Sequence, residues 1–417
     1  MLQKALSYLS LYGAHFLKLF TFIILLPHFA NVLNPGLWGK ILVIQSLSLW
    51  LQTVVEYGFN FSATRRMSVA RNDMKRLASL ISGVIGAKIF LSIIVSALVI
   101  LVLEATTIFE GLSSMLWLAA VSAIVQGFTP IWYFTASEKF GRFANIDMIA
   151  RVSYLLLCLS FIKDDNDGYL IFVFNIVVFA VANLIGYYFM FKEVDRKIPH
   201  LSDIIDALRD GAPMFIFYGI TSVYTTLSVF ILGLYQPATL IANYGTADRI
   251  VRSSAGLIDP INRVIFSRLS YLYKFEPKRA LHMLTLSSIL IASLGLSIFF
   301  GGRYLADFII NSFFPKYPDA SEFIKSLLFY VPIVALNSIL GLQIMLPLNM
   351  DKEFTSIFTI VSIFSFGAMV ILVPTGGTER MIDIIILSEL LVMILMVISI
   401  LRSGKLRDAL GRSSDGN

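Results

Sequence analysis

The chain has 417 residues, of which 57% are hydrophobic and 14% are charged, and its formal net charge is +6. Because soluble proteins carry about a quarter charged residues, this composition excludes an ordinary soluble domain and indicates a chain that crosses a membrane many times. A disulfide framework is excluded as well, because the sequence has one cysteine, Cys158.

Apolar runs that can cross a membrane follow one another along the whole chain. A spanning helix needs about 20 mainly apolar residues. The first run lacks the small-residue cleavage site of a secretory signal, so we expect it to be retained as a span. The runs lie near residues 9–32, 41–57, 79–103, 112–136, 146–162, 169–191, 212–234, 281–302, 322–348, 354–373 and 381–401.

The segment 241–265 would be a twelfth span, although it is charged. At 100° per residue, two acids and two bases fall on one stripe of its helix, about 60° wide. Such a stripe cannot face lipid, so we expect it to line a wet cavity or to face other helices. Ion pairs between residues four apart would also make these charges tolerable. The stripe consists of Asp248, Arg252, Asp259 and Arg263, with Arg249 beside it.

The distribution of basic residues indicates that segment 241–265 crosses the membrane. With twelve spans and both termini inside, 21 lysines and arginines lie in cytoplasmic segments and 5 in external segments. If 241–265 does not cross, everything after it is inverted and the counts become 15 and 14. Cytoplasmic loops of membrane proteins are enriched in Lys and Arg. The sequence therefore predicts twelve spans with both termini in the cytoplasm.

The twelve predicted spans divide into two lobes of six. The longest internal connection, 192–211, mixes acids and bases and falls midway along the chain. We interpret it as a cytoplasmic linker between an N-lobe at 1–191 and a C-lobe at 212–402, with a cytoplasmic tail at 403–417. The predicted fold class is thus an all-α polytopic membrane protein.

Sequence motifs of the common enzyme classes are absent. Walker A, GxGxxG, HExxH, GxSxG and paired CxxC patterns do not occur, and the four histidines lack metal-ligand spacing. No external loop is long enough to hold a sugar acceptor. A transporter is therefore favoured over an enzyme, without a cofactor or a metal. The basic residues are those expected of cytoplasmic loops, so no nucleic-acid partner is indicated.

Four further charged residues inside predicted spans are candidates for a functional role. Lys18 and Lys88 lie deep in the first and third spans, where snorkelling to the headgroups is difficult. Glu389 is deep in the last span and could carry a proton that couples transport. Glu56 is close to the inner interface, where solvation explains it as well as function does.

Four parts of the sequence resemble a known transporter family. The chain is similar to the prokaryotic polysaccharide-transport family, flippases for lipid-linked oligosaccharides such as O-antigen units, within the multidrug/oligosaccharidyl-lipid/polysaccharide exporter superfamily. One departure is Ala136, where the family often has glycine. The matching stretches are VEYGFNFSATRR at 55–66 followed by GAK at 86–88, PIWYF at 130–134, DRI at 248–250 with RLS at 268–270, and GLQ at 341–343 with LPL at 346–348.

The resemblance implies a V-shaped pair of six-helix lobes around a central cationic cavity. The cargo would be a glycan joined by diphosphate to a polyprenyl carrier, moved to the outer leaflet by alternating access. A diphosphate calls for cations held in a low-dielectric site, where arginine offers forked donors. The candidates for binding it are Lys18, Lys88, Arg249, Arg252 and Arg263, and the candidates for supporting or coupling charges are Glu56, Asp248, Asp259 and Glu389.

Two alternatives stay open. A cation-coupled drug or organic-cation antiporter of the same superfamily shares the architecture, but its cargo calls for acids, whereas the deep charges here lean basic. A membrane polysaccharide polymerase is less favoured, because no long external loop is predicted. The resemblance implies a location in the bacterial inner membrane and a lipid-linked glycan as the partner, and contacts with other polysaccharide assembly proteins would fit it.

Overall fold

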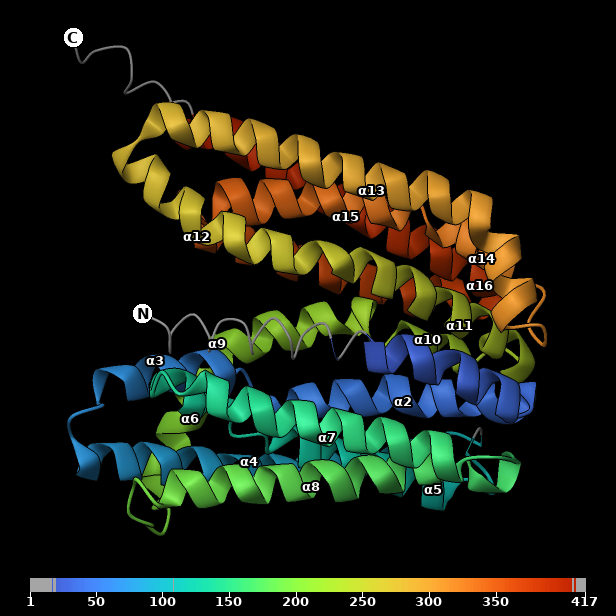
Figure 1. Cartoon of the computed structure of the whole chain (residues 1–417), viewed down its shortest axis with the longest axis horizontal. Helices are drawn as coiled ribbons and strands as arrows, with labels where there is room; N and C mark the ends of the chain where they lie inside the picture. Colours follow the sequence, from blue (N-terminus) through green and yellow to red (C-terminus); the bar gives the residue numbers. More distant parts are fainter. Residues whose placement is uncertain (1–16, 18–19, 108, 407–408, 410–417) are drawn as a thin grey trace. The chain divides into compact units, whose positions relative to one another are not determined.

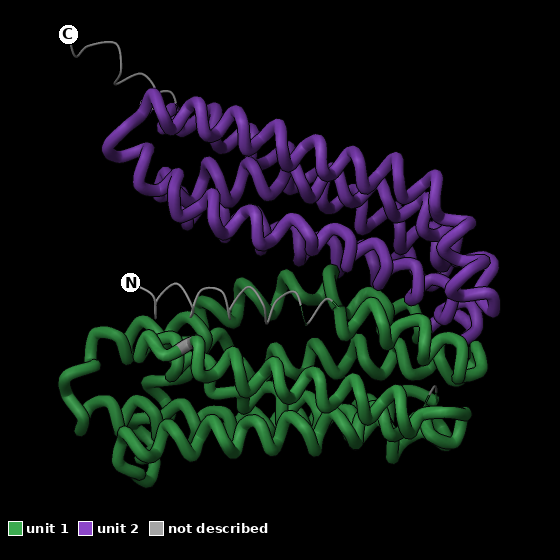
Figure 2. Tube along the Cα trace, in the orientation of Figure 1, with its two compact units in different colours: residues 1–234 green, residues 235–417 purple. Residues whose placement is uncertain are grey.

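The computed structural model describes residue 17 and residues 20–107, 109–406 and 409, and the described residues form helices and no strand (Figure 1). The chain divides into two compact units, Met1–Leu234 and Tyr235–Asn417 (Figure 2). Within each unit the helices lie side by side, as expected for apolar runs that bury one face against one another (Figure 1). The predicted all-α class is confirmed.

The described part of the first unit contains an apolar helix followed by nine labelled helices. Helix α2 starts at a proline, and the Asn34 side chain caps it by accepting a hydrogen bond from the Leu37 amide at 2.9 Å. The helices are Phe20–Val32, α2 (Pro35–Glu56), α3 (Phe59–Val69), α4 (Met74–Ala105), α5 (Ser113–Gly127), α6 (Ile131–Ala136), α7 (Phe140–Phe161), α8 (Leu170–Phe191), α9 (Leu201–Thr225) and α10 (Ser228–Gly233).

Two breaks between consecutive helices in this unit follow from the residues at the break. The first lies at the end of the predicted span 41–57, and the second lies inside the predicted span 112–136. Tyr57 and Gly58 have φ of 46° and 72° and separate α2 from α3. A Cβ on Gly58 would lie 2.5 Å from the Cβ of Met214, so only glycine fits there. Pro130, which has no amide hydrogen, lies between α5 and α6.

The second unit contains the charged segment and the last predicted spans. Helix α16 has 53 residues, which would be about 80 Å long if straight, far more than a bilayer of about 30 Å. Gly377 interrupts it with φ 58° and ψ −141°, so it forms two helices, as predicted. The helices are α11 (Ala238–Ala255), α12 (Asp259–Phe275), α13 (Pro277–Phe313), α14 (Ala320–Leu327), α15 (Tyr330–Ser338), a π-helix at Ile339–Met345, and α16 (Asp351–Ser403).

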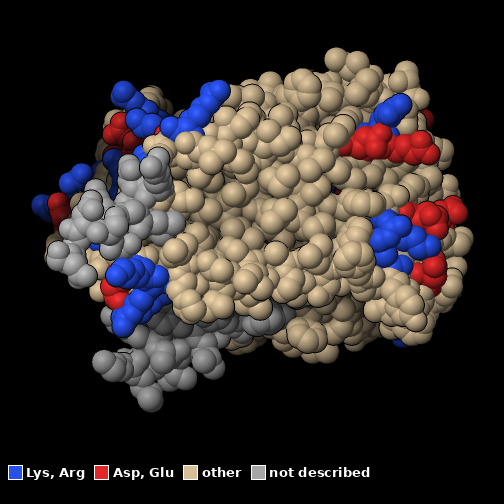
Figure 3. Space-filling model, turned by 90° about the horizontal axis from the view of Figure 1, so that it is seen from above, with Lys and Arg blue, Asp and Glu red and all other residues tan. Residues whose placement is uncertain are grey.

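The surface and the helix lengths agree with a membrane protein. Among the described residues, 7 helices are long and apolar enough to cross a membrane, and the 53-residue α16 is one of them. Each predicted run overlaps one helix or several consecutive helices in the part of the chain that the structure describes. On the face shown in Figure 3, charged side chains gather at two ends and leave a broad uncharged band between them.

Helix α9 packs in the first unit, on α4, α3 and α2. The contact is close, because a Cβ on Gly86 would lie 2.7 Å from Ile204, and a Cβ on Gly211 would lie 2.8 Å from the Tyr57 ring. The first unit accordingly ends at Leu234 and contains both the predicted linker at 192–211 and the predicted seventh span. The functional division into lobes at 192–211 stays a prediction.

Candidate functional site

The charged helix α11 holds a buried ion pair. Arg252 Nε donates to Asp248 Oδ1 at 2.7 Å, and the Asp248 residue is 6% exposed. The guanidinium carbon lies 5.3 Å from the centroid of the Tyr330 ring on α15, within cation–π range. The first predicted i,i+4 pair of the stripe is therefore present, and a neighbouring helix also covers it.

Two hydrogen-bond donors next to this ion pair have no acceptor among the described residues. They are Arg252 Nη2 and the Tyr244 hydroxyl, and both atoms are buried. Tyr244 is one turn before Asp248 on α11 and interacts electrostatically with Asp248 and Arg252. A buried donor without an acceptor costs about 1–3 kcal/mol. An acceptor brought here by a ligand or by water would remove that cost.

A buried carboxylate on α16 adjoins this pair through Tyr330. Glu389 is 5% exposed, and Asn337 Nδ2 on α15 donates to its carboxylate at 2.8 Å and to its carbonyl at 3.0 Å. Tyr330 interacts electrostatically with both Arg252 and Glu389. The second unit therefore has a polar cluster from three helices, made of Asp248, Arg252, Tyr330, Asn337 and Glu389.

The other half of the predicted stripe is arranged differently. Asp259 and Arg263 are both exposed, and this second pair is not among the ion pairs formed within the described residues. Both residues lie on α12, and a 3₁₀ turn at Gly256–Ile258 separates them from the α11 pair and rotates them off its stripe. At 3.0 residues per turn, three residues advance the helix phase by roughly 60° more than an α-helix would. Arg249 is half-buried on α11, on the near side of that turn.

The candidate charges of the first unit have partners of their own. Lys88 on α4 is 0% exposed, and its Nζ donates to the Gly127 carbonyl at 2.6 Å. Glu56 accepts from Gln52 Nε2 at 2.7 Å and from Asn60 Nδ2 at 3.4 Å. The predicted candidate Lys18 lies outside the described residues.

An ion cluster that the sequence does not predict is centred on Glu193, directly after α8. The Tyr133 hydroxyl donates to its carboxylate at 2.6 Å, Lys139 at 2.7 Å and Arg142 at 3.2 Å. Burial raises the pKa of Glu193, but the hydrogen bonds from Lys139 and Tyr133 outweigh it, so the pKa is lowered. Three members of the cluster line a cavity of about 310 Å³, together with Arg71; they are Tyr133, Lys139 and Glu193. No regular spacing in the sequence indicates it, since its members come from three separate segments.

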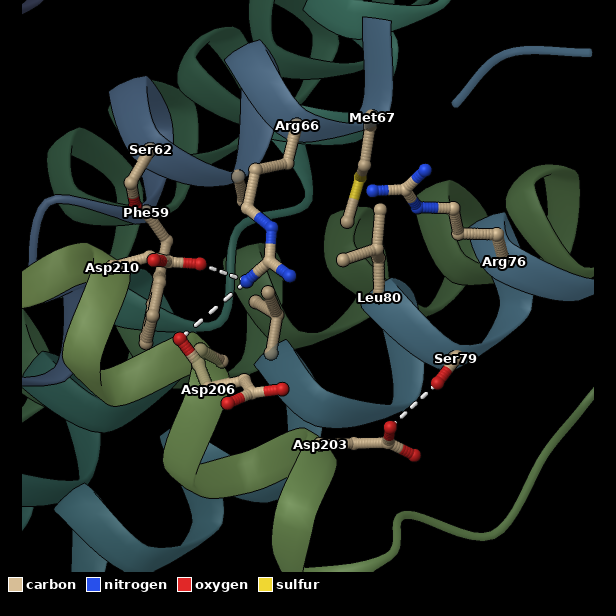
Figure 4. Close-up of a pocket in the computed structure, with 13 residues that line it drawn as sticks. Phe59, Ser62, Arg66, Met67, Arg76, Ser79, Leu80, Asp203, Asp206 and Asp210 are labelled. Carbon is tan, nitrogen blue, oxygen red and sulfur yellow. Dashed lines mark hydrogen bonds and ion pairs between the residues drawn. The ribbon is translucent and has the colours of Figure 1, made fainter. Parts of the chain in front are cut away.

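A second cavity, of about 130 Å³, lies where α9 meets α3 and α4 (Figure 4). Arg66 on α3 forms an ion pair with Asp210 on α9. The Ser79 hydroxyl on α4 donates to Asp203 at 2.6 Å, and this bond, together with one from Lys197, lowers the pKa of that carboxyl. Carboxylates of α9 thus bind donors on α3 and α4, and these bonds hold α9 against both helices.

Clusters of metal-binding side chains do not occur in the described part of the chain. Among these residues, no group of three or more His, Cys, Asp or Glu side chains could hold a metal ion. The single cysteine, Cys158, is buried.

Two known proteins match this chain over most of its length. A protein of Shigella dysenteriae named "Putative O-antigen transporter" is 26% identical over 407 residues, covering 95% of this chain and 99% of that one. An Escherichia coli K12 protein of the same name is 25% identical over 377 residues, covering 87% and 88%.

Solved structures show the fold. The lipid II flippase MurJ, in an inward closed conformation, matches with a TM-score of 0.70 at 15% identity, covering 97% of this chain and 90% of that one. A multidrug resistance MATE family transporter in an inward-facing conformation matches with a TM-score of 0.66 at 15% identity, covering 93% and 96%. The chain thus has the fold of transporters. A family model described as "Polysaccharide biosynthesis protein" matches residues 2–272, well over half of the sequence, and the chain belongs to that family.

Proposed function

We propose that this protein is a flippase that moves a polyprenyl-diphosphate-linked oligosaccharide from the cytoplasmic to the outer leaflet of the bacterial inner membrane. The glycan would be an O-antigen unit or a similar repeat of a surface polysaccharide. The family, the names of the relatives and the transporter fold support this proposal. Alternating access between the two sides would move the cargo.

The observation that carries the proposal is the buried arginine site of α11. A diphosphate offers several anionic oxygens, and a guanidinium can bind two of them with parallel hydrogen bonds. Arg252 has one donor, Nη2, without an acceptor among the described residues, and the Tyr244 hydroxyl is another. Arg249 lies on the same helix and adds positive charge. These groups suit an anionic headgroup better than a cationic drug.

Glu389 is our candidate for a coupling group. It is 5% exposed and interacts electrostatically with Tyr330, which also faces Arg252. A proton taken up or released by Glu389 would change the charge of the same cluster that binds the anion. A cation-coupled drug antiporter remains the second candidate, because a buried acid of this kind also suits a cationic cargo.

The test is complementation of a strain that makes the cognate glycan and lacks its flippase. We expect the native chain to restore surface polysaccharide and to empty the pool of lipid-linked glycan trapped at the cytoplasmic leaflet. The variant Arg252→Met, present in the membrane in the same amount as the native chain, should neither restore surface polysaccharide nor empty the pool of trapped glycan. Full complementation by Arg252→Met would refute the site. Drug efflux without any change in the glycan pool would favour the antiporter.

A further inference from the structure

Helix α5 ends inside the helix bundle, where its last backbone carbonyls need hydrogen-bond donors. Because Pro130 follows and offers no amide hydrogen, the last carbonyls of α5 cannot all be satisfied by a continuing helix. In a bilayer no water is available for them, so other groups of the protein must donate. Within the chain, the Gln126 carbonyl accepts from the Thr129 amide at 3.1 Å.

Side chains of two neighbouring helices donate to three carbonyls at this end, of which the Val125 carbonyl also accepts from the Phe128 amide at 3.2 Å. Asn183 Nδ2 on α8 donates to Val125 at 2.6 Å, and the Tyr187 hydroxyl on α8 donates to Phe128 at 2.7 Å. Lys88 Nζ on α4 donates to Gly127 at 2.6 Å. The three donors therefore form one cap, in which Lys88 is the charged member.

The positive charge of Lys88 is stabilised by groups within the first unit. The carboxyl end of a helix carries a partial negative charge, which a cation stabilises. The Nζ atom also lies 5.8 Å from the centroid of the Trp132 ring on α6, and Lys88 interacts electrostatically with Glu56. Since Lys88 is 0% exposed, no face of it is open to a ligand in this structure.

The cap at the end of α5 fixes the position of the next helix, α6. The Trp132 carbonyl accepts from Thr64 Oγ1 on α3 at 3.1 Å, and the Tyr133 hydroxyl donates to Glu193. The six residues of α6 thus connect the Lys88 cap with the Glu193 ion cluster. A change in the cap would shift both contacts together.

We propose that Lys88 is a positioning residue that caps the interrupted fourth span, and that the lipid diphosphate is bound by arginines of α11 in the second unit and not by Lys88. This inference rests on the proposed function. It separates two roles that the sequence does not distinguish, since Lys88 and Arg252 are both basic residues within predicted spans. Loss of Lys88 should slow transport, whereas loss of Arg252 should weaken binding.

The test compares binding with turnover in the full-length protein. Farnesyl diphosphate in detergent is the binding probe, because it carries the diphosphate without a sugar. Turnover is the surface polysaccharide produced per copy of protein in the complemented strain. We expect Lys88→Met to bind the probe within about twofold of the native chain and to lose about tenfold or more in turnover. Arg252→Met should weaken binding by about tenfold or more.

Uncharged variants of the same cap are the matched controls. Asn183→Leu and Tyr187→Phe remove the other two donors, so they should lower turnover in the same way without changing binding. Lys88→Gln keeps a donor and loses the charge, so it should restore part of the turnover, and it serves for binding if Lys88→Met does not accumulate. Weakened binding at normal thermal stability in either Lys88 variant would overturn the inference, as would native turnover in Lys88→Met.

Failure of the proposed function has a different signature. If the native chain does not bind farnesyl diphosphate, recognition of a diphosphate is refuted for the whole protein. The cap is then judged by thermal unfolding, in which Lys88→Met and Asn183→Leu should both melt below the native chain. Native melting of both variants would refute the cap itself.

Discussion

Removing the carboxylate of the buried Asp248–Arg252 pair should destabilise the second unit strongly. Asp248 is 6% exposed and the Arg252 side chain is 23% exposed, so Asp248→Asn leaves a guanidinium largely cut off from water without its counterion. Breaking a buried pair in this way costs about 3–5 kcal/mol. For a unit of this size, about 2–4 °C of melting temperature is lost per kcal/mol. The expected fall is roughly 6–20 °C.

The assay is thermal unfolding in nanodiscs, with two comparisons. Asp248→Leu combined with Arg252→Met removes both charges, and should melt within a few degrees of the native chain, because an apolar pair carries no desolvation cost. The control is Asp383→Asn, which breaks an exposed pair with Arg380 at 3.2 Å in the same unit and should cost less than about 1 kcal/mol. Equal losses for Asp248→Asn and Asp383→Asn, or a double variant as unstable as the single one, would refute the reasoning.

Three further predictions concern the helix interruption, the ion cluster and coupling. Gly58→Ala should cost about 2–4 kcal/mol in thermal unfolding, from φ of 72° and the close Cβ of Met214, whereas Gly111→Ala, at φ 76° in open space, should cost only about 1–2 kcal/mol. The folded pKa of Glu193 is lowered from 4.5, so its stabilisation is full above pH 4.5 and is lost as the pH falls through the folded pKa. Glu193→Gln should flatten that acid limb of the melting curve, and an unchanged limb would contradict the assignment. Glu389→Gln should make transport insensitive to the proton gradient, and an undiminished response in vesicles would contradict its coupling role.

The spans were predictable because each is a run of apolar residues long enough to cross a bilayer, and that property is local in sequence. The pair Asp248–Arg252 was predictable for the same reason, since residues four apart meet on one helix. Asp259 and Arg263 were extrapolated along a single α-helix, and the 3₁₀ turn at Gly256–Ile258 changed the phase. No apolar pattern marks that turn.

The partners of the first unit depend on packing between distant segments, which one sequence does not reveal. Pro130 indicates that carbonyls of the fourth span lose their partners, but nothing nearby shows that Lys88 supplies a donor. Likewise, the acids of 192–211 suggest a solvated linker, whereas Asp210 lies against Arg66, far away in the sequence. Close helix contacts made by glycines, visible only in three dimensions, decide which charges can meet.

A buried charge in a membrane protein has two possible causes, and the bonding state of its polar atoms separates them. Interrupted helices release carbonyls that lipid cannot satisfy, so a structural charge is expected where a span breaks, with its charged atom bonded to one of those carbonyls. Lys88 fits that case, because its ammonium lies on the Gly127 carbonyl and near Trp132. Arg252 differs, since Nη2 stays without an acceptor among the described residues although Nε is bonded to Asp248. Evolution tolerates such a cost where another state of the protein, or its cargo, supplies the acceptor. This criterion is why we propose the anion site on α11, a choice that a high density of charge alone would not support.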